Sequence, residues 1–154
     1  MTQREKVAWI STLVSTVIFG WYFWSVWADF SARALDGDVL FWRFVWCTGI
    51  AIAIMLPAAL LAARLGNEQF DPPPDELERN IERGAYRVGL VGLELSLVGV
   101  VLLSRWVSDV ARADYPSDPA GATAVILVNL VLFVTATCAV AREIAVILQY
   151  RRYA

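Results

Sequence analysis

The segment 84–104 most limits the fold of this chain, because it is apolar for long enough to cross a lipid bilayer as a helix of about 20 residues. Its small side chains recur at spacings of 4, 3, 4 and 3 residues, which places them in a stripe roughly 80° wide on a helix. Glycine is common in membrane helices, but frequency alone does not explain this phase. The pattern therefore predicts a seam where a neighbouring backbone approaches closely. The seam comprises Ala85, Gly89, Gly92, Ser96 and Gly99.

Glu94 lies in the same segment, about 180° around the helix from the seam. An ionisable side chain at such depth is costly and usually faces protein, water or a partner instead of lipid. We therefore expect another helix or a second protomer to cover this face, which argues against a lone monomer.

Four apolar runs of this kind occupy most of the 154 residues, 58% of which are hydrophobic. This fraction exceeds that of a typical soluble domain. We predict an all-α polytopic membrane protein, a four-transmembrane-helix bundle that forms one membrane domain over residues 1–154. The expected spans are about 7–28, 40–63, 84–107 and 121–148, with a cytosolic linker over 64–83.

The distribution of basic residues predicts the orientation. With both termini on the cytoplasmic side, nine basic residues lie on or near that side and four lie opposite. The nine are Arg4, Lys6, Arg64, Arg79, Arg83, Arg87, Arg142, Arg151 and Arg152, and the four are Arg33, Arg43, Arg105 and Arg112. We expect a multi-pass protein of the cytoplasmic (inner) membrane with both termini in the cytoplasm.

The absence of histidine excludes histidine-ligated haem, histidine-bearing zinc sites and a serine-histidine-aspartate triad. Serine and threonine residues in the spans have no neighbouring base. Cys47 and Cys138 each lie in an apolar run and are typical of small buried hydrophobes. We expect no catalytic residues, no metal site, no cofactor, no enzymatic activity and no direct binding of nucleic acid.

The extended first part of the linker ends in three prolines, 72–74, and Asp75 then suits the N-cap of a long helix. A helix that runs from Glu76 to near Val107 is about 48 Å long, so its first charged turns would extend into the cytosol. We expect these turns to form a partner-facing stub. The stub comprises Asp75, Glu78, Arg79, Glu82 and Arg83.

Aromatic residues cluster where the first span ends and the second begins, at one membrane face. Such clusters are typical of interfacial anchoring, and the alternative is a cleft for a flat apolar ligand such as a quinone, carotenoid or lipid. Arg43 can extend to the same interface. The cluster includes Trp21, Tyr22, Trp24, Trp27, Trp42 and Trp46.

The intramembrane polar residues that we take as candidate site residues are Glu94, Asn129, Arg142 and Glu143. Glu94 and Arg142 come from opposite directions to comparable depths, so a Glu94–Arg142 pair is one expectation. A contact with a partner or second protomer, and an ion or proton pathway, are the alternatives.

Three stretches are distinctive together: the start REKVAWIS, the run DELERNIERGAYRVG before the third span, and the tyrosine-arginine tail. Through them the chain resembles a family of small bacterial four-span integral membrane proteins of unknown function. The resemblance implies the four-span topology, and it implies that the protein is a membrane tether or antagonist of a helix-turn-helix regulator. The matching positions are Asp75, Glu76, Arg79, Ile81, Arg83 and Tyr86, whereas Leu77 replaces the family's arginine.

These features favour a non-enzymatic accessory or regulatory protein that acts through helix–helix contacts with a membrane complex or a cytosolic regulator. The partner is then the lipid bilayer together with another protein or a second copy of the chain. The alternatives are a carrier or sensor of an apolar small molecule, and an oligomeric ion pathway.

Overall fold

The computed structural model of the chain describes residues 3–65 and 76–153, and the described residues form four helices without a β-strand. The helices are α1 (Gln3–Ser31), α2 (Gly37–Leu65), α3 (Glu76–Asp114) and α4 (Pro119–Tyr153). All four are long and apolar enough to cross a membrane. The prediction of an all-α, multi-pass four-helix bundle is therefore confirmed.

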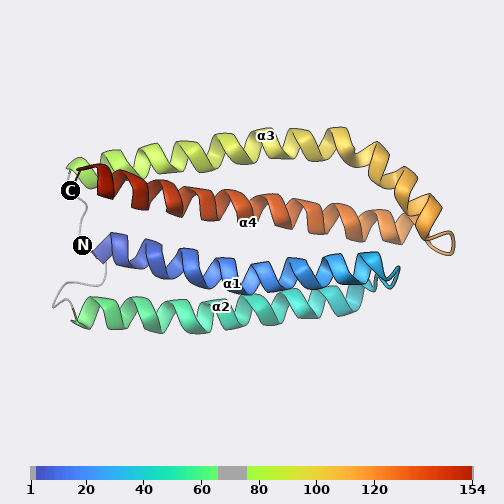
Figure 1. Cartoon of the computed structure of the whole chain (residues 1–154), viewed down its shortest axis with the longest axis horizontal. Helices are drawn as coiled ribbons and strands as arrows, with labels where there is room; N and C mark the ends of the chain where they lie inside the picture. Colours follow the sequence, from blue (N-terminus) through green and yellow to red (C-terminus); the bar gives the residue numbers. More distant parts are fainter. Residues whose placement is uncertain (1–2, 66–75, 154) are drawn as a thin grey trace.

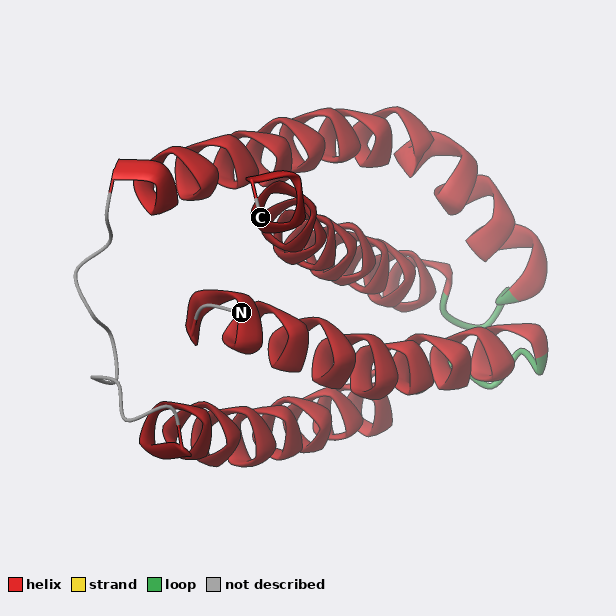
Figure 2. Cartoon of the chain, turned by 60° about the vertical axis from the view of Figure 1, so that its left-hand side comes forward, coloured by secondary structure: helices red, strands yellow, loops and turns green. Residues whose placement is uncertain are grey.

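The helices are arranged as two hairpins, with α1 against α2 and α3 against α4. Contacts between α1 and α4 join the hairpins, so these two helices lie in the middle and α2 and α3 lie on the outside (Figures 1 and 2). Both termini lie at one end of the bundle, here called the terminal end (Figure 1). The opposite end, with the short connections 32–36 and 115–118, is here called the loop end.

Large apolar side chains cover much of the outer surface of the bundle. Leu102, Val101 and Leu95 on α3 are 77%, 70% and 69% exposed. Such exposure would be unfavourable in water, but acyl chains cover these groups in a bilayer. Close packing and polar contacts between helices, instead of apolar burial, therefore determine how the four helices associate.

At the loop end, α1 terminates in a Schellman motif. The amide of Ala34 donates to the carbonyl of Asp29, and the amide of Arg33 donates to the carbonyl of Phe30, at 3.0 Å each. Arg33 adopts the left-handed conformation that this motif requires, with φ of 55°. Glycine is the usual residue at this position, because a β-carbon there is strained.

Side-chain caps begin the next helices. The carboxylate of Asp36 accepts from the amides of Asp38 and Val39 at 3.0 and 3.1 Å, and thereby caps α2. The carboxylate of Asp118 accepts from the amide of Gly121 at 2.9 Å, and α4 begins at Pro119. Proline has no amide hydrogen to donate. Its absence costs nothing in the first turn of this helix, because the first amides of a helix have no intrahelical acceptor.

The helix α3 is longer than predicted, since it continues past Val107 to Asp114. No helix breaker precedes Pro116, so the polar residues after Val107 extend the helix instead of forming a loop. The helix curves over this last part (Figure 1). There the hydroxyls of Ser104 and Ser108 donate to the carbonyls of Val101 and Ser104 at 2.7 and 3.0 Å, a pattern that commonly bends helices.

The helix α2 continues through Pro57 to Leu65. Proline lacks the amide that would bond the carbonyl four residues earlier, so the carbonyl of Ala53 loses its intrahelical donor. The predicted N-cap Asp75 and the prolines 72–74 lie outside the described residues.

Two substitutions at Arg33 should separate the strained backbone from the side-chain contact. Both Arg33→Ala and Arg33→Gly remove an ion pair with Asp114, but only glycine relieves the left-handed conformation. We expect the glycine variant to exceed the alanine variant by about 1 kcal/mol in free energy of unfolding, measured by dodecyl sulfate titration in mixed micelles. Equal stabilities would contradict the Schellman motif.

Candidate functional site

The small-residue stripe of α3 lies against α4 over part of its length. A β-carbon added at Gly89 would lie 3.2 Å from Cβ of Arg142 and 3.6 Å from the carbonyl oxygen of Cys138. One added at Gly92 would lie 3.5 Å from Sγ of Cys138. The helix α4 therefore packs closely on α3 at positions where α3 carries no side chain.

The remaining members of the stripe lie on either side of this close approach. Ala85 is 1% exposed, and Ser96 Oγ lies 4.0 Å from Cys138 Sγ. A β-carbon added at Gly99 would meet nothing within 4 Å. The close approach thus covers only part of the stripe, and Gly99 lies beyond it.

Glu94 is exposed on the outer surface of α3. It is the only charged residue between Arg87 and Arg105, a stretch whose 17 intervening residues span about 26 Å of helix. Its neighbours one turn away on either side are exposed and apolar: Leu90, Val91, Leu97 and Val98. The carboxylate therefore lies within an apolar surface at membrane depth.

The side chain of Arg142 bonds Glu143, its neighbour on α4, and not Glu94. The arginine Nε donates to Oε1 of Glu143 at 3.1 Å, and the Nη2 nitrogen bonds the same oxygen. The stem of Arg142 lies against Gly89, on the face of α3 opposite Glu94. The expected Glu94–Arg142 pair is therefore not formed, because α3 lies between the two groups.

Asn129 on α4 is 8% exposed and bonds Tyr22 of α1, which is 1% exposed. The Tyr22 hydroxyl donates to Oδ1 of Asn129 at 2.6 Å, while Nδ2 of Asn129 donates to the carbonyl of Val125 at 2.9 Å. This hydrogen bond connects the two hairpins inside the bundle. The assignment of Tyr22 to the interfacial aromatic cluster was wrong, since its ring is buried against Phe23 and Phe44.

Arg43 connects α2 to α1 near the loop end. Its Nη1 donates to Oγ of Ser25 at 2.8 Å and to the Asp29 carboxylate at 2.7 Å. The side chain is only 24% exposed, so its guanidinium group forms contacts within the α1–α2 hairpin. Sequence analysis missed this contact, although an arginine in the second span and an aspartate at the end of the first are a usable signal for it.

Each of the two short connections at the loop end is bonded to a helix end of the other hairpin. Arg33 forms an ion pair with Asp114 at 2.7 Å, and the Tyr115 hydroxyl donates to the carbonyl of Phe30 at 3.0 Å. Burial raises the pKa of Tyr115 above its ordinary value, and Asp114 raises the pKa further, while Arg33 lowers it. The hydroxyl thus stays protonated and remains a donor at neutral pH.

The five tryptophans of the aromatic cluster point outward. Trp21, Trp24 and Trp27 on α1 are 59%, 74% and 64% exposed, and Trp42 and Trp46 on α2 are 60% and 69% exposed. Outward indole rings near helix ends are typical of interfacial anchoring.

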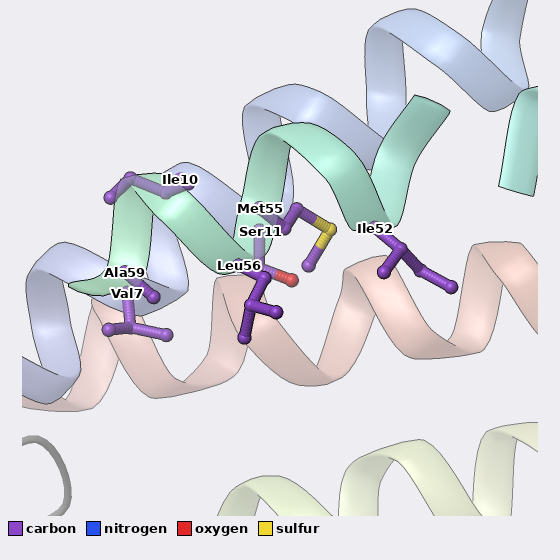
Figure 3. Close-up of a pocket in the computed structure, with 7 residues that line it drawn as sticks. All are labelled: Val7, Ile10, Ser11, Ile52, Met55, Leu56 and Ala59. Carbon is purple, nitrogen blue, oxygen red and sulfur yellow. The ribbon is translucent and has the colours of Figure 1, made fainter. Parts of the chain in front are cut away.

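An apolar groove lies between α1 and α2 (Figure 3), toward the terminal end and so away from the five tryptophans of the aromatic cluster. Its cavity volume is about 260 Å³. The residues that line it are Val7, Ile10, Ser11, Ile52, Met55, Leu56 and Ala59.

The predicted stub forms the first two turns of α3, apart from Asp75, which lies outside the described residues. Ile81, between the charged residues, is 1% exposed. Arg79 and Arg83 are exposed, whereas Glu78 and Glu82 are half-buried. One face of the stub therefore packs onto the protein, and the exposed residues occupy the rest.

Both cysteines are free, and no three metal-ligating side chains gather among the described residues. The chain matches no family model, no curated protein and no solved structure. Any functional assignment must therefore rest on the geometry described above.

Gly89→Leu should destabilise the protein, because the added side chain meets Arg142 and the backbone of Cys138. We expect a loss of about 1 to 3 kcal/mol in free energy of unfolding in mixed micelles, the usual cost of overpacking. Gly99→Leu is the matched control and should be close to neutral, because that position faces open space. Equal losses at both positions would exclude a close approach at Gly89.

The Tyr22–Asn129 hydrogen bond can be tested with a double-mutant cycle of Tyr22→Phe and Asn129→Leu. We expect a coupling energy between about 0.6 kcal/mol, the average for hydrogen bonds between membrane helices in double-mutant cycles, and about 1.7 kcal/mol, the maximum. Thr135→Val is the control partner, since the Thr135 hydroxyl donates only to the Val131 carbonyl of its own helix, at 2.8 Å. Additive effects in the first cycle would contradict the bond.

Proposed function

We propose that this multi-pass membrane protein is a non-enzymatic accessory or regulatory protein of the bacterial inner membrane, with both termini in the cytoplasm. In this proposal it acts through helix–helix contacts with a protein partner at the outer face of α3. The observation that carries the proposal is the exposed Glu94 carboxylate within an apolar surface at membrane depth.

The energetic argument concerns what covers Glu94. Insertion scales assign about 2.5 to 3.5 kcal/mol to a charged aspartate, lysine or arginine at the centre of a membrane helix. The basic group of α4 nearest in depth, Arg142, is bonded to Glu143. Arg87, on the same stripe as Glu94, is seven residues away, about 10 Å along the helix. A donor or cation from a partner helix would offset the cost that the described part of this chain leaves uncompensated.

The same stripe of α3 continues toward the terminal end through the exposed residues Arg87 and Arg83. A partner on this face would meet an acidic group within the bilayer and basic groups at its cytoplasmic boundary. This arrangement supports a specific interface, because a mismatched helix would leave Glu94 without a donor. The exposed part of the stub extends the interface into the cytoplasm.

An ion pathway has less support, because it requires several ionisable groups linked across the membrane. Glu94 and Arg142 lie on opposite sides of α3, and the Arg142 side chain bonds Glu143.

Photo-crosslinking in the native membrane tests the interface. A benzoylphenylalanine at Leu90 or Val98, on either side of Glu94, should form an adduct with a protein. Glu94→Leu should reduce the adduct at least tenfold without lowering the yield of the protein, because leucine suits lipid better than a carboxylate does. The same probe at Leu148, which is 62% exposed on α4, is the control.

Adducts only with lipid at Leu90 and Val98, or adducts that persist unchanged in Glu94→Leu, would overturn the proposal. An adduct whose mass is twice that of the chain would identify the partner as a second copy.

A further inference from the structure

The groove between α1 and α2 is apolar and opens at the surface of the bundle, within the span of both helices (Figure 3). The hydroxyl of Ser11 is the only side-chain polar group among its lining residues. Nothing in this lining could orient a polar small molecule, which requires several converging polar groups. The groove instead suits a hydrocarbon chain that lies along it.

A basic residue follows the groove on each helix toward the terminal end. Lys6 immediately precedes Val7 on α1, and Arg64 lies five residues after Ala59 on α2, about 7.5 Å along the helix. Lys6 directly precedes the apolar run that begins at Val7, and Arg64 is the first charged residue of α2 after Arg43, so both bases lie where the apolar runs of their helices end. Neither base forms an ion pair with any described residue.

We propose that this groove binds one acyl chain of an anionic phospholipid, with the lipid phosphate held between Lys6 and Arg64. The arrangement of groups along the two helices matches such a lipid, because the apolar groove lies within the bilayer and two cations follow it at headgroup depth. Charge complementarity favours an anionic lipid over a zwitterionic one, because the second group of a zwitterionic headgroup is a cation that the two bases repel. The surrounding bilayer supplies the ligand.

The way the hairpin is held together explains why the groove lies at this end. Toward the loop end, Phe19 and Tyr22 of α1 pack on Phe44 of α2, and Arg43 bonds Asp29. Toward the terminal end, the side chains that line the groove include Ala59, which is too small to fill the space between α1 and α2. The lipid would therefore complete the packing of α1 on α2.

This site is independent of the proposed partner interface, since it involves α1 and α2 and not α3. A failure of one proposal leaves the other unaffected.

Native mass spectrometry of the full chain released from lipid nanodiscs tests the proposal. The nanodiscs contain equimolar phosphatidylglycerol and phosphatidylcholine with identical acyl chains. We expect one retained lipid per chain, with phosphatidylglycerol in excess. Lys6→Gln and Arg64→Gln should each lower the ratio of bound phosphatidylglycerol to phosphatidylcholine roughly fivefold, the effect expected for one base near a charged membrane surface.

Matched variants separate the groove from general effects. Ala59→Phe fills the groove and should abolish the retained lipid, whereas Ala53→Phe, at an exposed position of the same helix, should retain it. Arg152→Gln, an exposed base at the same end, should leave the lipid ratio unchanged.

Four results would overturn the proposal. They are a wild-type ratio near one, retention of the lipid by Ala59→Phe, an equal fall of the ratio in Arg152→Gln, and a bound apolar molecule that is not a phospholipid. The lysine and arginine variants lie at the membrane surface, so they still decide the question if Ala59→Phe fails to fold.

Discussion

The hydrogen bond between Tyr22 and Asn129 is the interaction on which the arrangement of the bundle most depends. Contacts between α1 and α4 join the two hairpins, and this bond lies within that interface with both residues buried. A bilayer provides no hydrophobic force between helices, because lipid tails are as apolar as leucine. A polar contact that only one arrangement satisfies therefore specifies how the hairpins pack, even where its energy is modest.

The seam of α3 leads to the exposure of Glu94 by simple geometry. Small residues at Gly89 and Gly92 bring α3 against α4, and a helix that packs on one face presents the opposite face outward. Glu94 lies on that opposite face, so its exposure follows from the close approach. Arg142 cannot compensate, because its stem lies in the seam and its head group bonds Glu143. The seam of small residues on α3 thus explains both the packing of α3 on α4 and the outward position of Glu94.

The four long apolar helices and the fold class could be predicted because hydrophobic length is a local property of the sequence. The partners of Tyr22, Arg43 and Arg142 could not. An aromatic ring near a helix end has the same sequence signature whether it faces lipid or the protein, and only the rotation of α1 against α4 distinguishes Tyr22 from Trp21. Likewise, equal depth for Glu94 and Arg142 says nothing about which side of α3 each one occupies.

The two ends of the bundle are held by different chemistry. At the loop end, Arg33 bonds Asp114, and Tyr115 bonds the Phe30 carbonyl, so each connection is fixed to the other hairpin. At the terminal end, a contact of Arg151 with the ring of Trp9, at 5.4 Å, joins α4 to α1, and α1 and α2 enclose a groove. Polar contacts thus fix the connections at the loop end, whereas the groove between α1 and α2 lies toward the terminal end. That end also carries the basic residues and the start of α3, where a partner or a lipid could bias the packing of the helices.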